Sequence, residues 1–177
     1  MFDTLIETFP AKDGHSVEIH YDDHPESPRE WCNLGTFWTF HSRYNSPDPD
    51  PDQEFKPNDR EHIWLPVFMY DHSGVIYRAA HSNPFHCPWD SGCVGIIWVS
   101  KAQVRKEYGW KLITADRRVQ ILNYLKGEVD TYSQWAAGEV YGFVTKDPEG
   151  EEIDSCWGFF DDSTDFEYVR SEAEASI

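Results

Sequence analysis

The residue types that could do chemistry gather in one stretch, residues 81–95. This stretch holds two histidines, two cysteines and an Asp-Ser pair among prolines and glycines. Imidazole and thiolate are ligands that zinc prefers, and a thiol or hydroxyl beside a base can act as a nucleophile. The stretch could therefore be a metal site, a catalytic centre or a structured loop.

A metal site is the first interpretation. Its candidate ligands are His72, His81, His86 and Cys87. The spacing argues against it, because His86 and Cys87 are adjacent and the chain has no Cys-x-x-Cys pair of the kind that ordinary zinc modules use. We therefore expect no cofactor, and zinc is the metal that this set of residues would suit.

A catalytic nucleophile is the second interpretation. Cys87, Cys93 or Ser91 would need a neighbouring base, and Ser91 lacks the Gly-x-Ser-x-Gly setting of a nucleophile elbow. The Asp-Ser-Gly sequence at 90–92 is more simply a turn in which the Asp and Ser side chains bond backbone amides. An enzyme centred on residues 81–95, dependent on a metal or a thiol, is therefore kept as an alternative. The residues that we expect to have a structural role in this loop are Trp89, Asp90, Ser91 and Gly92.

The elements that flank this stretch are strands. Residues 63–70 are the most apolar run of the chain, residues 71–74 form a turn and residues 75–78 return, which predicts a β-hairpin at the centre of a sheet. Residues 94–100 predict a buried strand on the other side of the loop. Further strand patterns occupy residues 2–9, 16–21, 36–41, 139–146 and 151–159.

Between residues 101 and 137 the apolar period changes to that of a helix. Ser100 predicts the start of a helix over residues 101–108, which Gly109 ends. A second helix is expected over residues 115–126, ended by Gly127, and a third helical piece over residues 131–137. The fold class that follows is α+β, with an antiparallel or mixed sheet of about six to eight strands and a small helical insert at about 101–137.

The chain has the length of one domain. We expect a single α+β domain over residues 1–160, with an exposed Pro/Asp loop at 45–59 that can neither pair in a sheet nor form a helix. Residues 161–177 are expected to be an acidic, partly frayed C-terminal tail. No apolar run approaches the roughly 20 residues of a membrane span, so a soluble, cytoplasmic protein is predicted, and its four cysteines should be reduced and at least half-buried.

The formal net charge of −17 is distributed unevenly. Residues 1–62 carry −9, residues 63–126 carry +4 and residues 127–177 carry −12. This charge argues against general nucleic-acid binding and suits a basic partner surface, although adaptation to high salt or solubility would also explain it. The basic helices could touch nucleic acid or bind the protein's own acidic regions, and we favour the second because it offsets self-repulsion. Their basic residues include Lys101, Arg105, Lys106, Arg117 and Arg118.

Several strings of residues resemble a known family. They read Pro-Trp-Asp-Ser-Gly-x-Val-Gly, Lys-Glu-Tyr-Gly-Trp-Lys, Gly-Glu-Val-x-Thr-Tyr-x-Gln, Gly-Glu-Val-Tyr-Gly-Phe and Glu-Glu-Ile-Asp-Ser-Cys-Trp-Gly-Phe, between residues 88 and 159. Together with residues 65–74 they resemble a family of small, uncharacterised proteins encoded by phages and mobile elements. The resemblance covers about residues 63–160 and implies a genomic context, the cytoplasm of a host cell, and a plausible role against host defence.

The charge and the resemblance together predict a non-enzymatic inhibitor. It would bind a host defence protein or ribonucleoprotein that targets nucleic acid, of the anti-CRISPR or antirestriction type, as a DNA mimic. A regulatory module that binds a small ligand, with Trp89, Trp98 and Trp157 lining its pocket, is a further alternative. No membrane partner is expected. The acidic residues that we expect to bind the partner's basic surface are Asp147, Glu149, Glu151, Glu152, Asp154, Asp161 and Asp162.

Overall fold

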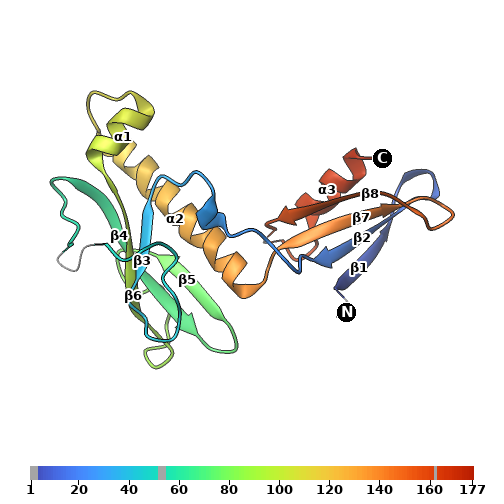
Figure 1. Cartoon of the computed structure of the whole chain (residues 1–177), viewed down its shortest axis with the longest axis horizontal. Coiled ribbons are helices and arrows are strands. Elements are labelled where there is room, and N and C mark those ends of the chain that lie inside the picture. The colour runs from blue at the N-terminus through green and yellow to red at the C-terminus, as the bar shows by residue number, and fades with distance from the viewer. Residues whose placement is uncertain (1–3, 52–54, 162) are drawn as a thin grey trace. The chain divides into compact units, whose positions relative to one another are not determined.

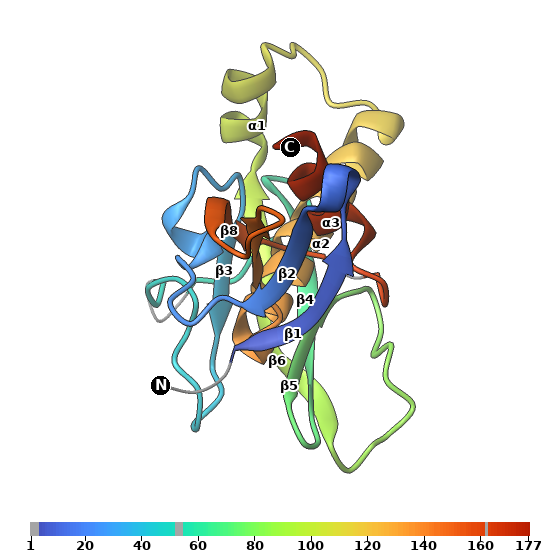
Figure 2. The same cartoon turned by 90° about the vertical axis from the view of Figure 1, so that its right-hand side faces the viewer.

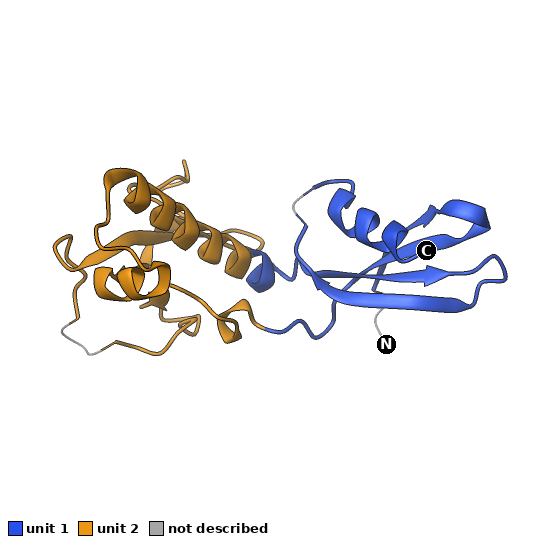
Figure 3. Ribbon diagram, turned by 90° about the horizontal axis from the view of Figure 1, so that it is seen from above, with its two compact units in different colours: residues 1–26, 134–177 blue, residues 27–133 orange. Residues whose placement is uncertain are grey.

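The computed structural model describes residues 4–51, 55–161 and 163–177. In this part of the chain eight antiparallel strands form two four-stranded sheets, accompanied by three α-helices. The predicted α+β class is therefore confirmed. The chain divides into two compact units, which we call unit 1 (residues 1–26 and 134–177) and unit 2 (residues 27–133) (Figure 3).

Unit 1 is a sheet covered on one face by a helix. Its strands are β1 (Leu5–Pro10), β2 (Ser16–Tyr21), β7 (Tyr141–Lys146) and β8 (Glu152–Phe159), in the order β1-β2-β7-β8. The helix α3 (Glu167–Ala175) packs against β2 and β7 (Figure 1). Alternate residues of the strands point toward α3, as the period of a strand requires. The buried core of the unit consists of Val17, Ile19, Tyr141, Phe143, Val169 and Ala173.

The C-terminal segment is more ordered than the sequence suggested. We expected the chain to fray from residue 161, but residues 167–175 form α3 and bury Val169 and Ala173 completely. These two apolar residues are four positions apart, so they lie on one face of the helix. The expectation of fraying is therefore wrong for this helix.

Unit 2 is built on a sheet of order β3-β6-β4-β5. Its strands are β3 (Thr36–Thr39), β4 (His62–Asp71), β5 (Val75–Ala79) and β6 (Ser91–Ser100). The strand β4 alternates buried with half-buried residues, and the helix α2 (Ala115–Ala137) lies across the sheet (Figure 1). Phe37 of β3 meets Tyr132 of α2 edge to face, with ring centroids 5.3 Å apart. The predicted hairpin of β4 and β5 is present. Of its two strands, β4 lies inside the sheet as predicted, whereas β5 lies at the edge.

The helical insert differs from the prediction in one respect. Helix α1 (Lys101–Tyr108) begins where Ser100 Oγ accepts a hydrogen bond from Gln103 N and ends at Gly109, as predicted. Helix α2, however, continues through Gly127 to residue 137, so the expected break there is wrong. A glycine inside a helix costs about 1 kcal/mol, and the buried face that continues beyond it with Val129 and Tyr132 outweighs that cost.

Three further expectations concern loops and boundaries. Residues 52–54 of the predicted Pro/Asp loop lie outside the described residues, whereas Asp48 within that loop is held by Arg29 and is only partly exposed. Three of the four cysteines are exposed and only Cys87 is partly buried, so the expectation of buried thiols is wrong for most of them. The single domain over residues 1–160 stays a prediction, because two compact units can still unfold together.

Candidate functional site

The predicted loop over residues 81–95 is shorter in the structure, because β6 begins at Ser91 and not at residue 94 as expected. Residues 80–90 leave the sheet after β5 and return into β6 as a wide excursion (Figure 2). Its own side chains close it. Ser91 Oγ donates to the carbonyl oxygen of Cys87 at 2.5 Å and accepts from Asn83 Nδ2 at 2.9 Å. The expectation that the Asp90 and Ser91 side chains bond backbone amides is therefore corrected, since the Ser91 partner is a carbonyl and the Asp90 carboxylate accepts from the Cys87 thiol.

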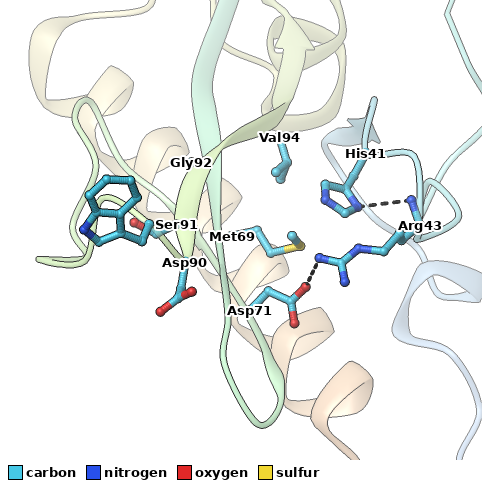
Figure 4. A pocket seen from close by; sticks show the side chains of 9 residues that line it. His41, Arg43, Met69, Asp71, Asp90, Ser91, Gly92 and Val94 are labelled. Atoms are coloured by element: carbon cyan, nitrogen blue, oxygen red, sulfur yellow. Dashed lines mark hydrogen bonds and ion pairs between the residues drawn. The ribbon is translucent and has the colours of Figure 1, made fainter.

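The four residues predicted to be structural line a shallow pocket of about 260 Å³. Across the pocket from Asp90 and Ser91, Arg43 donates to Asp71 Oδ2 at 2.6 Å (Figure 4). Asp71 neutralises Arg43, so Asp90 leaves the lining with a formal charge of −1, which disfavours an anion. The full lining is His41, Arg43, Met69, Asp71, Trp89, Asp90, Ser91, Gly92 and Val94.

The candidate metal ligands do not converge. His72 Nδ1 lies 3.6 Å from Asp90 Oδ2, and the same carboxylate oxygen accepts from Cys87 Sγ at 3.3 Å. His81 and His86 are exposed in the loop. Within residues 4–51, 55–161 and 163–177, no group of three or more His, Cys, Asp or Glu side chains is placed to hold a metal ion. This arrangement adds no support to the zinc alternative.

The candidate nucleophiles have partners other than a base. The Cys87 thiol donates to Asp90, and the Ser91 hydroxyl donates to a backbone carbonyl. Among the hydrogen bonds of the described residues, neither group has an imidazole as its partner. This geometry gives no nucleophile and base pair of the kind that covalent catalysis requires, so it adds no support to an enzyme centred on this loop.

The acidic hairpin of unit 1 joins β7 to β8. Asp147 Oδ1 accepts from the backbone N–H groups of Glu149 (3.0 Å) and Glu151 (2.8 Å), so this carboxylate builds the turn. The other predicted carboxylates here, including those of Glu152 and Asp154, are exposed. The strand β8 lies at the edge of the sheet, and its pairing with β7 shifts register twice. Charges and bulges of this kind discourage pairing with a further strand, so the hairpin presents side chains rather than its backbone.

Asp161 is buried and stabilises the start of α3. Its carboxylate accepts hydrogen bonds from Ser163 N at 2.9 Å, Tyr168 N at 3.0 Å and Val169 N at 3.2 Å. Burial on its own would raise the pKa of this carboxyl, but the hydrogen bonds from Ser163, Val169 and Tyr168 prevail and lower the pKa below its ordinary value. The structure gives Asp161 this role in folding, and Asp162 lies outside the described residues.

Acidity is concentrated in one unit. Unit 1 has 19 acidic and three basic residues among 70, a formal net charge of −16. Unit 2 has 13 acidic and 12 basic residues among 107, a formal net charge of −1. The two acidic ends of the sequence belong to the same unit because β2, near the N-terminus, pairs with β7.

The basic helical residues have partners within unit 2. Arg118 bonds Asp59 Oδ1 at 3.1 Å, and Lys101 Nζ donates to the carbonyl oxygen of Asp59 at 2.7 Å. Arg117 lies over the ring of Trp110, 4.6 Å from its centroid. Arg105 and Lys106 are exposed on α1. Three of the five basic residues that we singled out are thus engaged in local contacts.

A buried ion network in unit 2 was not found from the sequence. Arg29 donates to both carboxylate oxygens of Asp48, at 2.9 and 2.5 Å, and to Glu128 Oε2 at 3.0 Å. Glu128 Oε1 also accepts from the backbone N–H groups of Leu34 at 2.7 Å and Gly35 at 3.1 Å. Burial would lower the pKa of Arg29, but its bonds to Asp48 and Glu128 raise it above its ordinary value. The network holds residues 29–35 against α2.

This held segment forms one wall of two adjoining hollows, of about 430 and 360 Å³. Both hollows share Cys32, Asn33 and Tyr124, and we call them together the groove. Burial raises the pKa of the Tyr108 phenol in the groove, and the neighbouring Tyr124, Glu107 and Glu128 raise it further. The groove is lined by Pro28, Trp31, Cys32, Asn33, Leu34, Gln103, Glu107, Tyr108, Asn123, Tyr124, Gly127, Glu128 and Thr131.

The aromatic pocket expected from three tryptophans has a different composition. Trp157 belongs to unit 1, whereas Trp89 and Trp98 belong to unit 2. Trp98 is buried, and Trp89 is 92% exposed at the edge of the pocket beside Arg43. The groove uses Trp31 and two tyrosines instead. The available sequence signals were Gly127 within a helical pattern and Glu128 on the buried side of that helix.

Comparison with known proteins gives no relative. No family model, no curated protein and no solved structure matches this chain. The resemblance to proteins of phages and mobile elements therefore stays a prediction. None of the helices in the described residues is both long enough and apolar enough to cross a membrane.

Proposed function

We propose that this chain is a non-enzymatic binding protein whose unit 1 occupies a basic, nucleic-acid-binding surface of a partner protein, in the manner of a DNA mimic. The observation that carries the proposal is the charge of unit 1, which is −16 in 70 residues against −1 in the 107 residues of unit 2. A solubility effect alone does not require the net negative charge to be concentrated in one unit.

The hairpin supports this proposal through its exposure. Glu149, Glu151 and Glu152 are exposed, and none of them forms an ion pair with another described residue. Crowded carboxylates repel one another and destabilise the compact state. A basic partner would relieve that repulsion, so the complex would be more stable than the separate proteins.

The partner class follows from the sequence resemblance. A context of phages and mobile elements favours a host complex that recognises foreign DNA, of the CRISPR or restriction type. Such complexes bind DNA largely through contacts of Lys and Arg with phosphates. An acidic protein surface that reaches the same cations would compete with the DNA.

An interference assay tests this function. Cells with an active CRISPR or restriction system receive a targeted plasmid while they express the wild-type chain or one of two variants. The hairpin variant is Glu149→Gln/Glu151→Gln/Glu152→Gln, and the matched control removes three exposed carboxylates of unit 2, Glu30→Gln/Asp50→Asn/Asp116→Asn. We expect the wild type and the control to restore transformation and the hairpin variant to restore much less. Equal activity of the two variants would contradict the role of unit 1.

A further inference from the structure

We propose that the groove of unit 2 binds an extended, proline-containing peptide that carries a basic residue, supplied by a partner protein. This site lies entirely within unit 2. It is therefore separate from the acidic surface of unit 1 and does not depend on the function proposed for that surface.

The shape of the groove suits an extended chain. Its two hollows are consecutive, and Tyr124 lines both. Two large aromatic side chains of its lining are open to solvent, since Trp31 and Tyr124 are exposed to 45% and 47%. Polyproline II peptides repeat every three residues and dock between aromatic side chains, because their conformation is already formed and little entropy is lost on binding.

Gly127 is a second, independent indication of a ligand. It lies in the interior of α2 and lines the larger hollow, and apart from its chain neighbours and the backbone of its own helix no atom lies within 4 Å of the position that a Cβ would occupy. Packing within the chain therefore does not require glycine here, although glycine costs the helix about 1 kcal/mol relative to alanine. Close approach of a ligand to the backbone of α2 accounts for the absence of a side chain.

The charge of the lining selects the class of ligand. Glu107 and Glu128 are its charged residues, and the lining includes no Lys or Arg. A phosphate would be repelled, which argues against a nucleic acid. Glu128 is already paired with Arg29, so Glu107 is the carboxylate that can pair with a lysine or arginine of the peptide.

The walls of the groove are held in place before a ligand arrives. Glu128 fixes the backbone of Leu34 and Gly35, and Gln103 Nε2 donates to the carbonyl oxygen of Leu34 at 3.2 Å. Asn33 Nδ2 donates to the carbonyl oxygens of Pro28 (2.8 Å) and Trp31 (3.0 Å). A preformed site of this kind loses less free energy on binding than a flexible one.

Fluorescence anisotropy with labelled probes tests the proposal on the full chain. The main probe is a short polyproline peptide with one central arginine. Its comparison probes are the same peptide with glutamate in place of arginine, a Gly/Ser peptide with the same arginine, and oligothymidine. The variants are Tyr124→Ala, which removes a wall, Gly127→Leu, which fills the larger hollow with a better helix former, and Glu107→Gln. The matched control is Tyr168→Ala, an exposed helical tyrosine of unit 1.

We expect saturable binding of the main probe, weakened about tenfold or more by Tyr124→Ala and by Gly127→Leu and unchanged by Tyr168→Ala. Glu107→Gln should reduce the preference for arginine over glutamate in the probe. If the Gly/Ser peptide bound as tightly as the main probe, net charge alone would explain the binding and the proposal would be overturned. Displacement of the main probe by oligothymidine would overturn it as well. No binding by the wild type, or unchanged binding by Gly127→Leu, would also overturn it. The hairpin variant should bind the peptide normally, so that this site and the function of unit 1 can fail separately.

Discussion

Replacing Glu128 by alanine should destabilise unit 2 more than any surface substitution on the same helices. The side chains of Arg29 and Glu128 are 6% and 7% exposed, so both charges are removed from water. The substitution deletes the bond to Arg29 and the acceptor for the N–H groups of Leu34 and Gly35. Breaking a buried charge pair by removing one partner costs about 3–5 kcal/mol. Arg29 keeps its two bonds to Asp48, so we expect the lower end, about 3 kcal/mol.

Urea denaturation followed by circular dichroism measures this loss. Glu128→Gln keeps an oxygen acceptor for the backbone amides but turns the charged bond to Arg29 into a weaker one, and should cost about 2 kcal/mol. The control Glu107→Ala changes an exposed carboxylate of α1 and should stay within about 0.5 kcal/mol of the wild type. A loss below about 1 kcal/mol for Glu128→Ala would refute the claim that this network holds residues 29–35 against α2.

Three other predictions follow from single groups. The folded-state pKa of Asp161 is lowered, so its carboxylate stabilises the fold above its unfolded-state pKa of about 4. This stabilisation is lost as the pH falls through the folded-state pKa. Hydrogen exchange of α3 between pH 6 and 2 should show the loss in the wild type and not in Asp161→Asn. Gly127→Ala should raise the free energy of unfolding by about 1 kcal/mol, measured by urea denaturation. A lower free energy of unfolding for this variant would contradict the open space beside Gly127. Burial raises the pKa of Tyr77 and Tyr132, so their phenolate absorbance should appear at higher pH in the folded chain than in urea. The free energy of unfolding should then fall above about pH 10. Identical tyrosine titration curves for the folded chain and the chain in urea would contradict this.

The strands and the first helix could be predicted because local sequence determines them. The apolar run of β4 is visible in the sequence, and so are the cap at Ser100 and the stop at Gly109. The expected end of α2 at Gly127 failed because local propensity is weaker than the burial of Val129 and Tyr132. Propensity reports what a segment prefers alone, and packing decides what it adopts.

The division into two units could not be predicted from patterns along the chain. It depends on the pairing of Val17 and Ile19 in β2 with Thr145 and Phe143 in β7, more than 120 positions later. The sequence showed two acidic ends, whereas the pairing of β2 with β7 combines them into one acidic unit. Register between distant strands is a tertiary property that no local signal records.

The groove was missed for a related reason. Arg29 and Glu128 lie 99 positions apart, and neither stands in a motif. The stretch that attracted attention, residues 81–95, is rich in reactive residue types, but their side chains mostly bond within the loop. Residue type shows which chemistry is available, and geometry shows which groups meet.

The most direct test of the central claim is a competition for DNA on the defence complex that the interference assay identifies. Binding of labelled target DNA to that purified complex is measured by mobility shift against increasing amounts of the chain, at low and high salt. We predict that the wild type displaces the DNA, that displacement weakens as salt rises, and that the hairpin variant displaces it poorly while the unit 2 control retains full effect. Unchanged DNA binding at saturating wild-type chain, or equal displacement by the hairpin variant, would contradict the assignment of unit 1 as a DNA mimic.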